Sequence, residues 1–240
     1  MPDIFYDPPN RSRLVVLSGA GISAESGLKT FRDSDGLWMG YNIEDVATPR
    51  AFQRDPQLVL DFYNMRRRDV ANAQPNEAHI QLAKLEEKYH VTIITQNIDD
   101  LHERAGSSRV LHLHGEIFKM RSSAGPDYRH ITDIRGDIKL GDLAPDQTQY
   151  RPHIVWFEEA VPMIETAAEI MQAADIFLLV GTSLQVYPAA GLIHYLPEDA
   201  LKFVLDKKVP PIQGDQVFTI IEKPATEGIH DFLNCLQCIM

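Results

Sequence analysis

The chain has 240 residues, which suits one large domain or one domain with a small insert, and 44% of its residues are apolar, enough for a sizeable core. A formal net charge of −11 makes it a poor candidate for tracking nucleic-acid phosphates. The chain has only two cysteines, both near the C-terminus, which argues against a disulfide framework. Met1–Asn10 does not resemble a signal peptide, and the sequence contains no long apolar run. These features predict a soluble cytoplasmic protein without a membrane partner.

Apolar, β-prone runs alternate with helical patterns along the chain. The runs that predict strands are 14–17, 91–95, 110–113, 154–156, 176–180, 203–205 and 218–221. The spacing of apolar residues predicts helices over 57–70, 76–89, 163–174 and 225–236. This alternation is typical of an α/β fold, and we expect a Rossmann-like, doubly wound parallel sheet.

One stretch, 119–150, interrupts this rhythm because it is rich in Gly, Asp, Arg and Ser and shows only weak alternation. It predicts a small inserted domain. We expect a single catalytic domain over 1–240. Its large part would comprise about 10–50, 76–118 and 151–240, and its inserts would be about 51–75 and 119–150.

The turn after the first expected strand carries the pattern Gly19-x-Gly21-x-x-Ala24. Small residues there let the backbone close on a pyrophosphate, and a following helix, for which Ser23 is the expected N-cap, supplies N–H groups. The alternative is a strand-to-helix turn that needs glycines only for its geometry. A dinucleotide site is the first inference.

A dehydrogenase would place an acidic residue close after a second strand, about 20 residues further on, to hold the ribose. Here the segment 33–38 is polar and turn-like, with no strand before it. The loop after the glycines carries Phe31, Arg32 and Trp38. These features favour a cofactor held under a loop for chemistry other than hydride transfer.

Polar residues follow three more expected strands, at the sheet edge where ligands bind in open α/β folds. Gln96, Asn97, Ile98 and Asp99 follow the strand over 91–95, and the amide and carboxylate two residues apart could recognise ribose and carboxamide. The alternative is an Asx-rich turn that opens a helix over 101–105.

His114-Gly115 follows the strand over 110–113, where a histidine can act as a general base, although His112 is an equal candidate by residue type. Gly181-Thr182-Ser183 follows the strand over 176–180 and suits a phosphate or ribose, or else a capped turn.

Together these motifs resemble the sirtuins, the NAD-dependent protein-lysine deacylases. The matching segments are GAGISAESG and FR within 19–32, TQNID at 95–99, LHERAG at 101–106, HG at 114–115, RPHIVWF at 151–157 and GTSLQVYPA at 181–189. The resemblance implies a Rossmann-like large domain, a small domain, and a cleft between them that binds NAD as co-substrate and an acyl-lysine peptide. The implied products are free lysine, nicotinamide and O-acyl-ADP-ribose.

The resemblance also implies roles for individual residues. His114 would be the general base, with Asn97 beside it in the catalytic centre. Residues expected to bind the cofactor are Gly19, Ala20, Gly21, Ala24, Phe31, Arg32, Trp38, Gln96, Asn97, Ile98, Asp99, Gly181, Thr182, Ser183, Asp206 and Ala225. Val155, Trp156 and Phe157 would pair with the extended substrate backbone as an added strand.

Tyr63 and Arg66 lie three residues apart on an expected helix and so share a face. A YxxR at this place resembles the bacterial sirtuins that remove succinyl and malonyl groups. An arginine fork pairs a carboxylate bidentately, the tyrosine hydroxyl adds a hydrogen bond, and the small Ala24 leaves room. Acetyl groups would also fit. The alternative is that 66–68, three arginines, form a basic run on a solvated helix.

The chain departs from the family in its small domain, which usually holds zinc with two CxxC pairs, because 115–150 contains no cysteine. We therefore expect no metal site. Packing of Phe118, Tyr128, Ile131, Ile134 and Leu140 would hold the insert instead. Two single positions also differ: Glu158 stands where the family has glycine, and Asp206 where an asparagine contacts the adenosine ribose.

Two other readings remain open on the sequence alone. An NAD hydrolase or ADP-ribosyl transferase would keep Asn97, Asp99 and His114 but would not need Tyr63 and Arg66. A non-catalytic NAD-binding module would need no base, and the presence of His114 argues against it. The leading hypothesis is a deacylase whose partners are acylated lysines of proteins.

Overall fold

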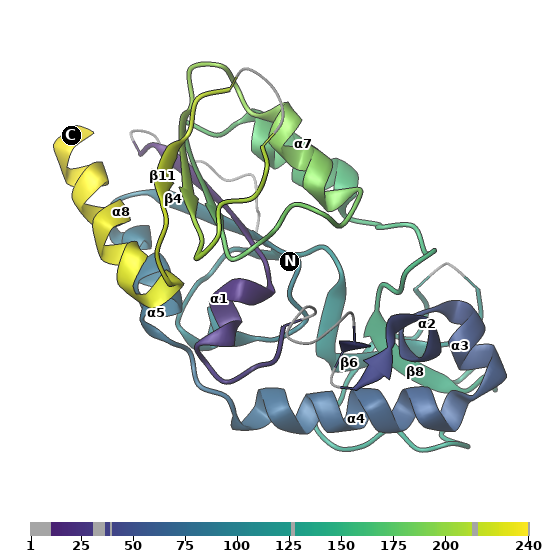
Figure 1. The fold of residues 1–240 in the computed structure, drawn as a ribbon. Helices are drawn as coiled ribbons and strands as arrows, with labels where there is room; N and C mark the ends of the chain where they lie inside the picture. The colour runs from purple at the N-terminus through teal and green to yellow at the C-terminus, as the bar shows by residue number, and fades with distance from the viewer. Residues whose placement is uncertain (1–10, 31–36, 39, 126–127, 213–215, 240) are drawn as a thin grey trace.

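The structure, a computed structural model, describes residues 11–30, 37–38, 40–125, 128–212 and 216–239. Its centre is a parallel sheet whose strand order is β11-β10-β9-β1-β4-β5 (Figure 1). The bounds are β1 (Arg13–Ser18), β4 (His90–Thr95), β5 (Val110–His112), β9 (Ile176–Val180), β10 (Leu201–Leu205) and β11 (Thr219–Ile221). The chain winds outward from β1 to β5 in one direction and from β9 to β11 in the other, so the order reverses between β1 and β9. The Rossmann-like sheet is confirmed, and a ligand crevice is expected at this reversal.

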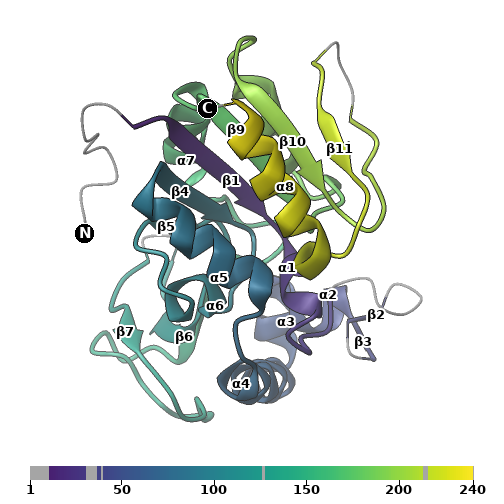
Figure 2. The same ribbon diagram turned by 90° about the vertical axis from the view of Figure 1, so that its left-hand side faces the viewer.

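Helices cover both faces of the sheet (Figures 1 and 2). Strand residues such as Leu14 and Val16 pack with α5 (Glu77–Lys84), the short 3-10 helix η1 (Leu85–Glu87) and α8 (Ala225–Ile239). Their neighbours Val15 and Leu17 pack with α7 (Ile164–Gln172) and the 3-10 helix η2 (Ala189–Tyr195). Both sides of the central strands are therefore buried, which explains why their sequences are continuous apolar runs.

A smaller part lies beside the carboxyl ends of the sheet, at the lower right of Figure 1. It contains α2 (Ile43–Val46), α3 (Pro49–Arg54), α4 (Pro56–Asn72) and a short hairpin of β2 (Leu37–Trp38) and β3 (Tyr41–Asn42). Its antiparallel sheet has the order β7-β6-β8, with β6 (Gly115–Ser122), β7 (Thr132–Asp133) and β8 (Tyr150–Ile154). The strand predicted over 154–156 is wrong, because β8 ends where that segment begins and pairs with β6 instead of joining the large sheet.

The insert is held by apolar packing only in part. Phe118 is buried, as expected, but the predicted packing of Ile131 and Leu140 is wrong, because they are 45% and 56% exposed. Polar contacts also stabilise the insert: Ser122 Oγ donates to Asp146 at 2.6 Å and lies 2.8 Å from Thr148 Oγ1. Hydrogen bonds thus tie β6 to the loop before β8.

A second polar tie joins the insert to α4. Asn64 accepts the backbone N–H of Ile138 and donates to its carbonyl, each at 2.9 Å, and accepts from Arg67 at 2.7 Å. Arg67 also donates to Ile117 O at 2.9 Å. All these side chains are buried, so each bond satisfies a group that water cannot reach.

In the described part of the chain, no group of three or more His, Cys, Asp or Glu side chains is placed to hold a metal ion. Cys235 and Cys238 lie on α8, a helix that packs against the large sheet rather than the insert, and Cys238 is exposed. None of the described helices is long and apolar enough to cross a membrane.

Asn64→Ala should lower the free energy of unfolding by about 3 kcal/mol, because it leaves the buried backbone groups of Ile138 without partners. Chemical denaturation measures the change. Gln57→Ala, which removes an exposed bond to Asp61 on the same helix, is the control and should change it by less than about 0.5 kcal/mol. Equal effects of the two substitutions would contradict this account of the insert.

Candidate active site

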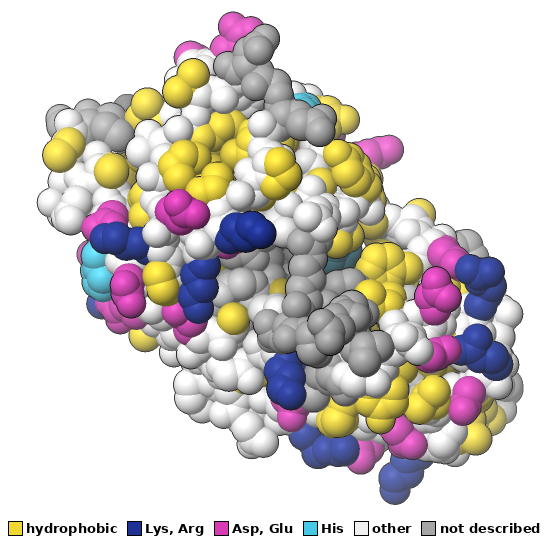
Figure 3. Space-filling model, in the orientation of Figure 1, with side chains coloured by type: hydrophobic (Ala, Val, Ile, Leu, Met, Phe, Trp, Pro, Cys, Tyr) yellow, Lys and Arg dark blue, Asp and Glu magenta, His cyan; other side chains and the backbone are white. Residues whose placement is uncertain are grey.

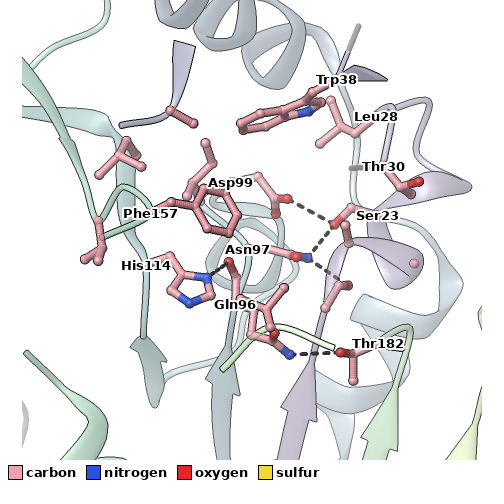
Figure 4. A pocket seen from close by; sticks show the side chains of 18 of the residues that line it. Ser23, Leu28, Thr30, Trp38, Gln96, Asn97, Asp99, His114, Phe157 and Thr182 are labelled. Atoms are coloured by element: carbon pink, nitrogen blue, oxygen red, sulfur yellow. Dashed lines mark hydrogen bonds between the residues drawn. The ribbon is translucent and has the colours of Figure 1, made fainter. Parts of the chain in front are cut away.

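One cavity opens at the carboxyl ends of β1, β4, β9 and β10, between the large sheet and the smaller part (Figures 3 and 4). Gly19, Gln96, Thr182 and Asp206 line it from the strand ends. Tyr63 of α4 and Trp156 after β8 line it from the smaller part. The cavity therefore lies at the crevice that the strand order predicts.

The glycine turn brings two backbones into direct contact. The Gly21 N–H donates to Gly181 O at 2.8 Å, and a Cβ on Gly21 would lie 2.7 Å from Gly181 Cα. Gly181 also has a φ of +64°, in the left-handed region that favours glycine. Chain geometry alone thus requires these glycines, and the turn they make forms part of the cavity wall. Ser23 as N-cap is wrong, because α1 (Ala20–Ala24) begins after Gly19 and places Ser23 inside the helix.

Ser23 instead joins the two polar residues that follow β4 (Figure 4). Its Oγ accepts from Asn97 Nδ2 at 3.1 Å and donates to Asp99 Oδ2 at 3.1 Å. Asn97 Nδ2 also donates to Gly19 O, and Asp99 Oδ1 accepts the Leu101 N–H. All three side chains are buried, so Asn97 and Asp99 are held in one orientation at the cavity wall.

Asp99 serves as both a helix-turn residue and a cavity residue. Burial raises the pKa of its carboxyl, and the hydrogen bonds from Leu101 and Ser23 oppose that rise. The turn alternative was therefore correct in part, because Asp99 accepts the N–H of the first residue of α6 (Leu101–Arg104). The same carboxylate lines the cavity.

The structure separates the two histidines that the sequence left equivalent. His114 lines the cavity, and its Nδ1–H donates to Gln96 O at 3.0 Å, which leaves Nε2 as the basic nitrogen. Gln96 Nε2 donates to Thr182 Oγ1 at 3.0 Å (Figure 4). His112 places both nitrogens on acceptors, at 3.1 Å from Asn97 O and 2.7 Å from Glu103 Oε1.

These surroundings shift the two pKa values in opposite directions. Burial lowers the pKa of His114, and its one bond to a carbonyl only partly offsets this. Burial also disfavours charge on His112, but the hydrogen bond and charge of Glu103 outweigh it and raise its pKa. A lowered pKa keeps His114 neutral near pH 7, so that its Nε2 can accept a proton, whereas both nitrogens of His112 already have partners.

Tyr63 and Arg66 both reach the cavity wall from α4 and both are buried. The Arg66 guanidinium carbon lies 5.4 Å from the centre of the Trp38 ring, and Trp38 also packs edge-on against Tyr63. Burial lowers the pKa of Arg66, and the charges of Asp69 and Asp99 oppose this. The reading of 66–68 as a solvated run holds only for Arg68, which is exposed and pairs with Asp137.

The segment that follows β8 also lines the cavity. The Val155 N–H donates to His114 O at 2.9 Å and the Phe157 N–H to Ala47 O at 3.0 Å. Glu158, which has a φ of +74°, reaches the cavity edge and forms an ion pair with Arg50. At the end of β10, Asp206 accepts the Lys208 N–H, and burial raises the pKa of its carboxyl.

Most residues expected from the sequence meet at this cavity. Those that line it are Gly19, Ala20, Gly21, Trp38, Tyr63, Arg66, Gln96, Asn97, Ile98, Asp99, His114, Val155, Trp156, Phe157, Gly181, Thr182, Ser183 and Asp206. Ala24 and Ala225 do not line it, and Phe31 and Arg32 lie outside the described residues. Sequence reasoning missed Ser23 as a cavity residue, and it also missed Leu28 and Glu159. The spacing of Ser23 within the glycine motif was the one signal that could have found it.

Comparison with known proteins gives consistent matches. Residues 19–188 match the Sir2 family. An NAD-dependent protein deacylase of Bacteroides thetaiotaomicron is 51% identical over 227 residues, which cover 93% of this chain and 97% of that protein. A protein of the same description from Helicobacter pylori is 51% identical over 220 residues, 92% of this chain and 95% of that protein.

Solved structures agree with the sequence matches. A Sir2 homologue in complex with NAD has a TM-score of 0.83 and 34% identity, covering 96% of this chain and 91% of its own. An S24A variant of a Sir2 homologue in complex with ADP-ribose has a TM-score of 0.85 and 34% identity, covering 96% of this chain and 94% of its own.

NMR titration of the ring nitrogens should give His114 a pKa below the usual 6.5 and His112 a pKa above it. Glu103→Gln should lower the pKa of His112 while leaving that of His114 in place, because only His112 contacts Glu103. A pKa of His114 equal to or above that of His112 would contradict the assignment of the neutral histidine.

Proposed function

The chain belongs to the Sir2 family, the sirtuins, and is an NAD-dependent protein deacylase that acts on acylated lysines; from that premise we propose that it removes succinyl and malonyl groups as well as acetyl. The observation that carries the proposal is the placement of Tyr63 and Arg66 in the cavity wall. Both side chains are buried, and such a pair suits an acyl chain that ends in a carboxylate.

Burial strengthens the contacts that Arg66 and Tyr63 can make with a carboxylate. A guanidinium can pair both oxygens of a carboxylate, and the Tyr63 hydroxyl can donate a further hydrogen bond. Burial keeps the Tyr63 hydroxyl protonated by raising its pKa, so it stays a donor. Trp38 packs against both side chains, which limits their freedom before the ligand arrives. An NAD hydrolase would need neither Tyr63 nor Arg66.

The strand-end groups fit the co-substrate. The turns at Gly19–Gly21 and Gly181 are in contact and line the cavity with backbone atoms. Thr182, Ser183 and Asp206 add hydroxyl and carboxylate groups suited to phosphates and ribose. When bound, NAD supplies a ribose carbon that bears nicotinamide as a leaving group. Asn97 and Asp99, fixed by Ser23, would orient the carboxamide and ribose at that carbon.

His114 would serve as the general base of the reaction. Its Nδ1–H is held by Gln96 O, so Nε2 would take the proton of a ribose hydroxyl. Because burial lowers the His114 pKa, the ring stays neutral as the pH falls to the usual histidine value of 6.5. A bond from Gln96 to Thr182 links the base to the residues proposed to hold the nucleotide.

The segment Val155–Phe157 would hold the peptide. The Trp156 N–H donates to Glu159 Oε2 at 2.8 Å, and the amides of Val155 and Phe157 are also taken by this chain. An added peptide strand would therefore be held here mainly by donating its own N–H groups to carbonyl oxygens of the segment.

Arg66→Met should lower kcat/KM for a succinyl-lysine peptide by about 10- to 100-fold, because it removes a charge-assisted pair, while that for the matching acetyl peptide should change by less than about threefold. Arg68→Met, on the exposed face of the same helix, is the control and should spare both peptides. Steady-state assays of nicotinamide release give the values. Equal losses on both peptides would refute Arg66 as the carboxylate-binding residue.

A further inference from the structure

Two buried arginines face each other in the small sheet. Arg121 on β6 and Arg151 on β8 are direct cross-strand neighbours, and their side chains are only 2% and 7% exposed. Like charges placed opposite each other in a sheet destabilise it, and a buried charge without a partner costs more. The sheet therefore needs a counter-charge at this point.

Glu159 supplies that counter-charge from the loop after β8. Its two carboxylate oxygens accept from Arg151 at 2.7 and 3.0 Å, a bidentate pair, while Arg121 lies 3.4 Å from the nearer oxygen. Burial would raise the pKa of Glu159, but the hydrogen bond and charge of Arg151 outweigh this and lower it. Glu159 is thus ionised and contacts an arginine on each of the two strands.

The same carboxylate also holds the segment at the cavity. Glu159 Oε2 accepts the Trp156 N–H at 2.8 Å, and the Arg151 guanidinium carbon lies 3.2 Å from the centre of the Trp156 ring. Trp156 lines the cavity next to Tyr63. A chain of contacts therefore runs from the insert, through Glu159, to the segment Val155–Phe157.

We propose that Glu159 is a positioning residue of the deacylation, which joins Arg121 and Arg151 to the Trp156 backbone and so holds Val155–Phe157 in the conformation that accepts the peptide. The inference rests on the proposed function only in taking this segment as the peptide-binding strand. Because its carboxylate already accepts from arginine and from the Trp156 N–H, we assign Glu159 no contact with the nucleotide.

Glu159→Ala should raise the KM for an acetyl-lysine peptide by about tenfold or more, because the Trp156 amide loses its charged acceptor. The affinity for NAD without peptide, measured by calorimetry, should stay within about twofold. Glu159→Gln should raise the peptide KM less, because its amide oxygen can still accept from Trp156. An acetyl peptide keeps the test separate from the role proposed for Arg66.

Asp137→Asn is the matched control, since it breaks an Arg–carboxylate pair of the same insert that is exposed and away from the cavity. It should leave the peptide KM unchanged. If Glu159→Ala folds poorly, adding Arg121→Met removes one of the two opposed charges. Thermal stability should then recover while the peptide KM stays high.

Three results would overturn the proposal: an unchanged peptide KM in both Glu159 variants, a peptide KM that recovers together with stability, or an equal loss of NAD affinity. Failure of the proposed acyl preference would look different. In that case the unaltered enzyme would turn over the acetyl peptide but not the succinyl peptide, and the effect of Glu159 on the acetyl KM would remain measurable.

Discussion

The contact between two glycine turns organises the active site. Gly19 and Gly21 donate to the carbonyls of Val180 and Gly181, at 3.0 and 2.8 Å, where the strand order reverses. No side chain fits between these backbones, so the ends of β1 and β9 meet directly. The Asn97 side chain donates a hydrogen bond to Gly19 O, which holds the residues that follow β4 next to the same turn. The placement of the polar groups around the cavity follows from this contact.

The smaller part completes the cavity without a metal ligand set in the described residues, whereas the small domain of the family usually holds zinc. Three sets of polar contacts join its elements: Asn64 and Arg67 with the backbone of the insert, Ser122 with Asp146, and Glu159 with two arginines. Buried polar contacts of this kind are costly to break singly, so they fix one arrangement of the sheet. That arrangement sets where Trp156 and Tyr63 lie.

Much of this could be predicted from the sequence because burial leaves a strong signal. Strands covered on both faces read as apolar runs, and the ends of neighbouring parallel strands must meet, which placed Asn97, Asp99 and His114 together. The sequence also placed Tyr63 and Arg66 on the same face of their helix, because residues three positions apart in a helix lie side by side.

Other features depend on contacts between distant segments that no local pattern reports. Three consecutive arginines look alike, yet Arg66 reaches the cavity, Arg67 binds backbone carbonyls and Arg68 reaches water. Ser23 has the residue type of a cap but meets Asn97 and Asp99, more than 70 residues away. The segment at 154–156 has strand composition, but the N–H groups of Val155 and Trp156 donate to His114 O and Glu159 rather than to a strand of the large sheet.

In the function we propose, this cleft transfers a carboxylate-bearing acyl group from lysine to the ribose of NAD. Mass spectrometry of the nucleotide product, formed with a succinyl-lysine peptide, tests it most directly. We expect O-succinyl-ADP-ribose in equal amounts with free nicotinamide and deacylated peptide, and no nucleotide product without peptide. Formation of plain ADP-ribose at the same rate with and without peptide would contradict the claim.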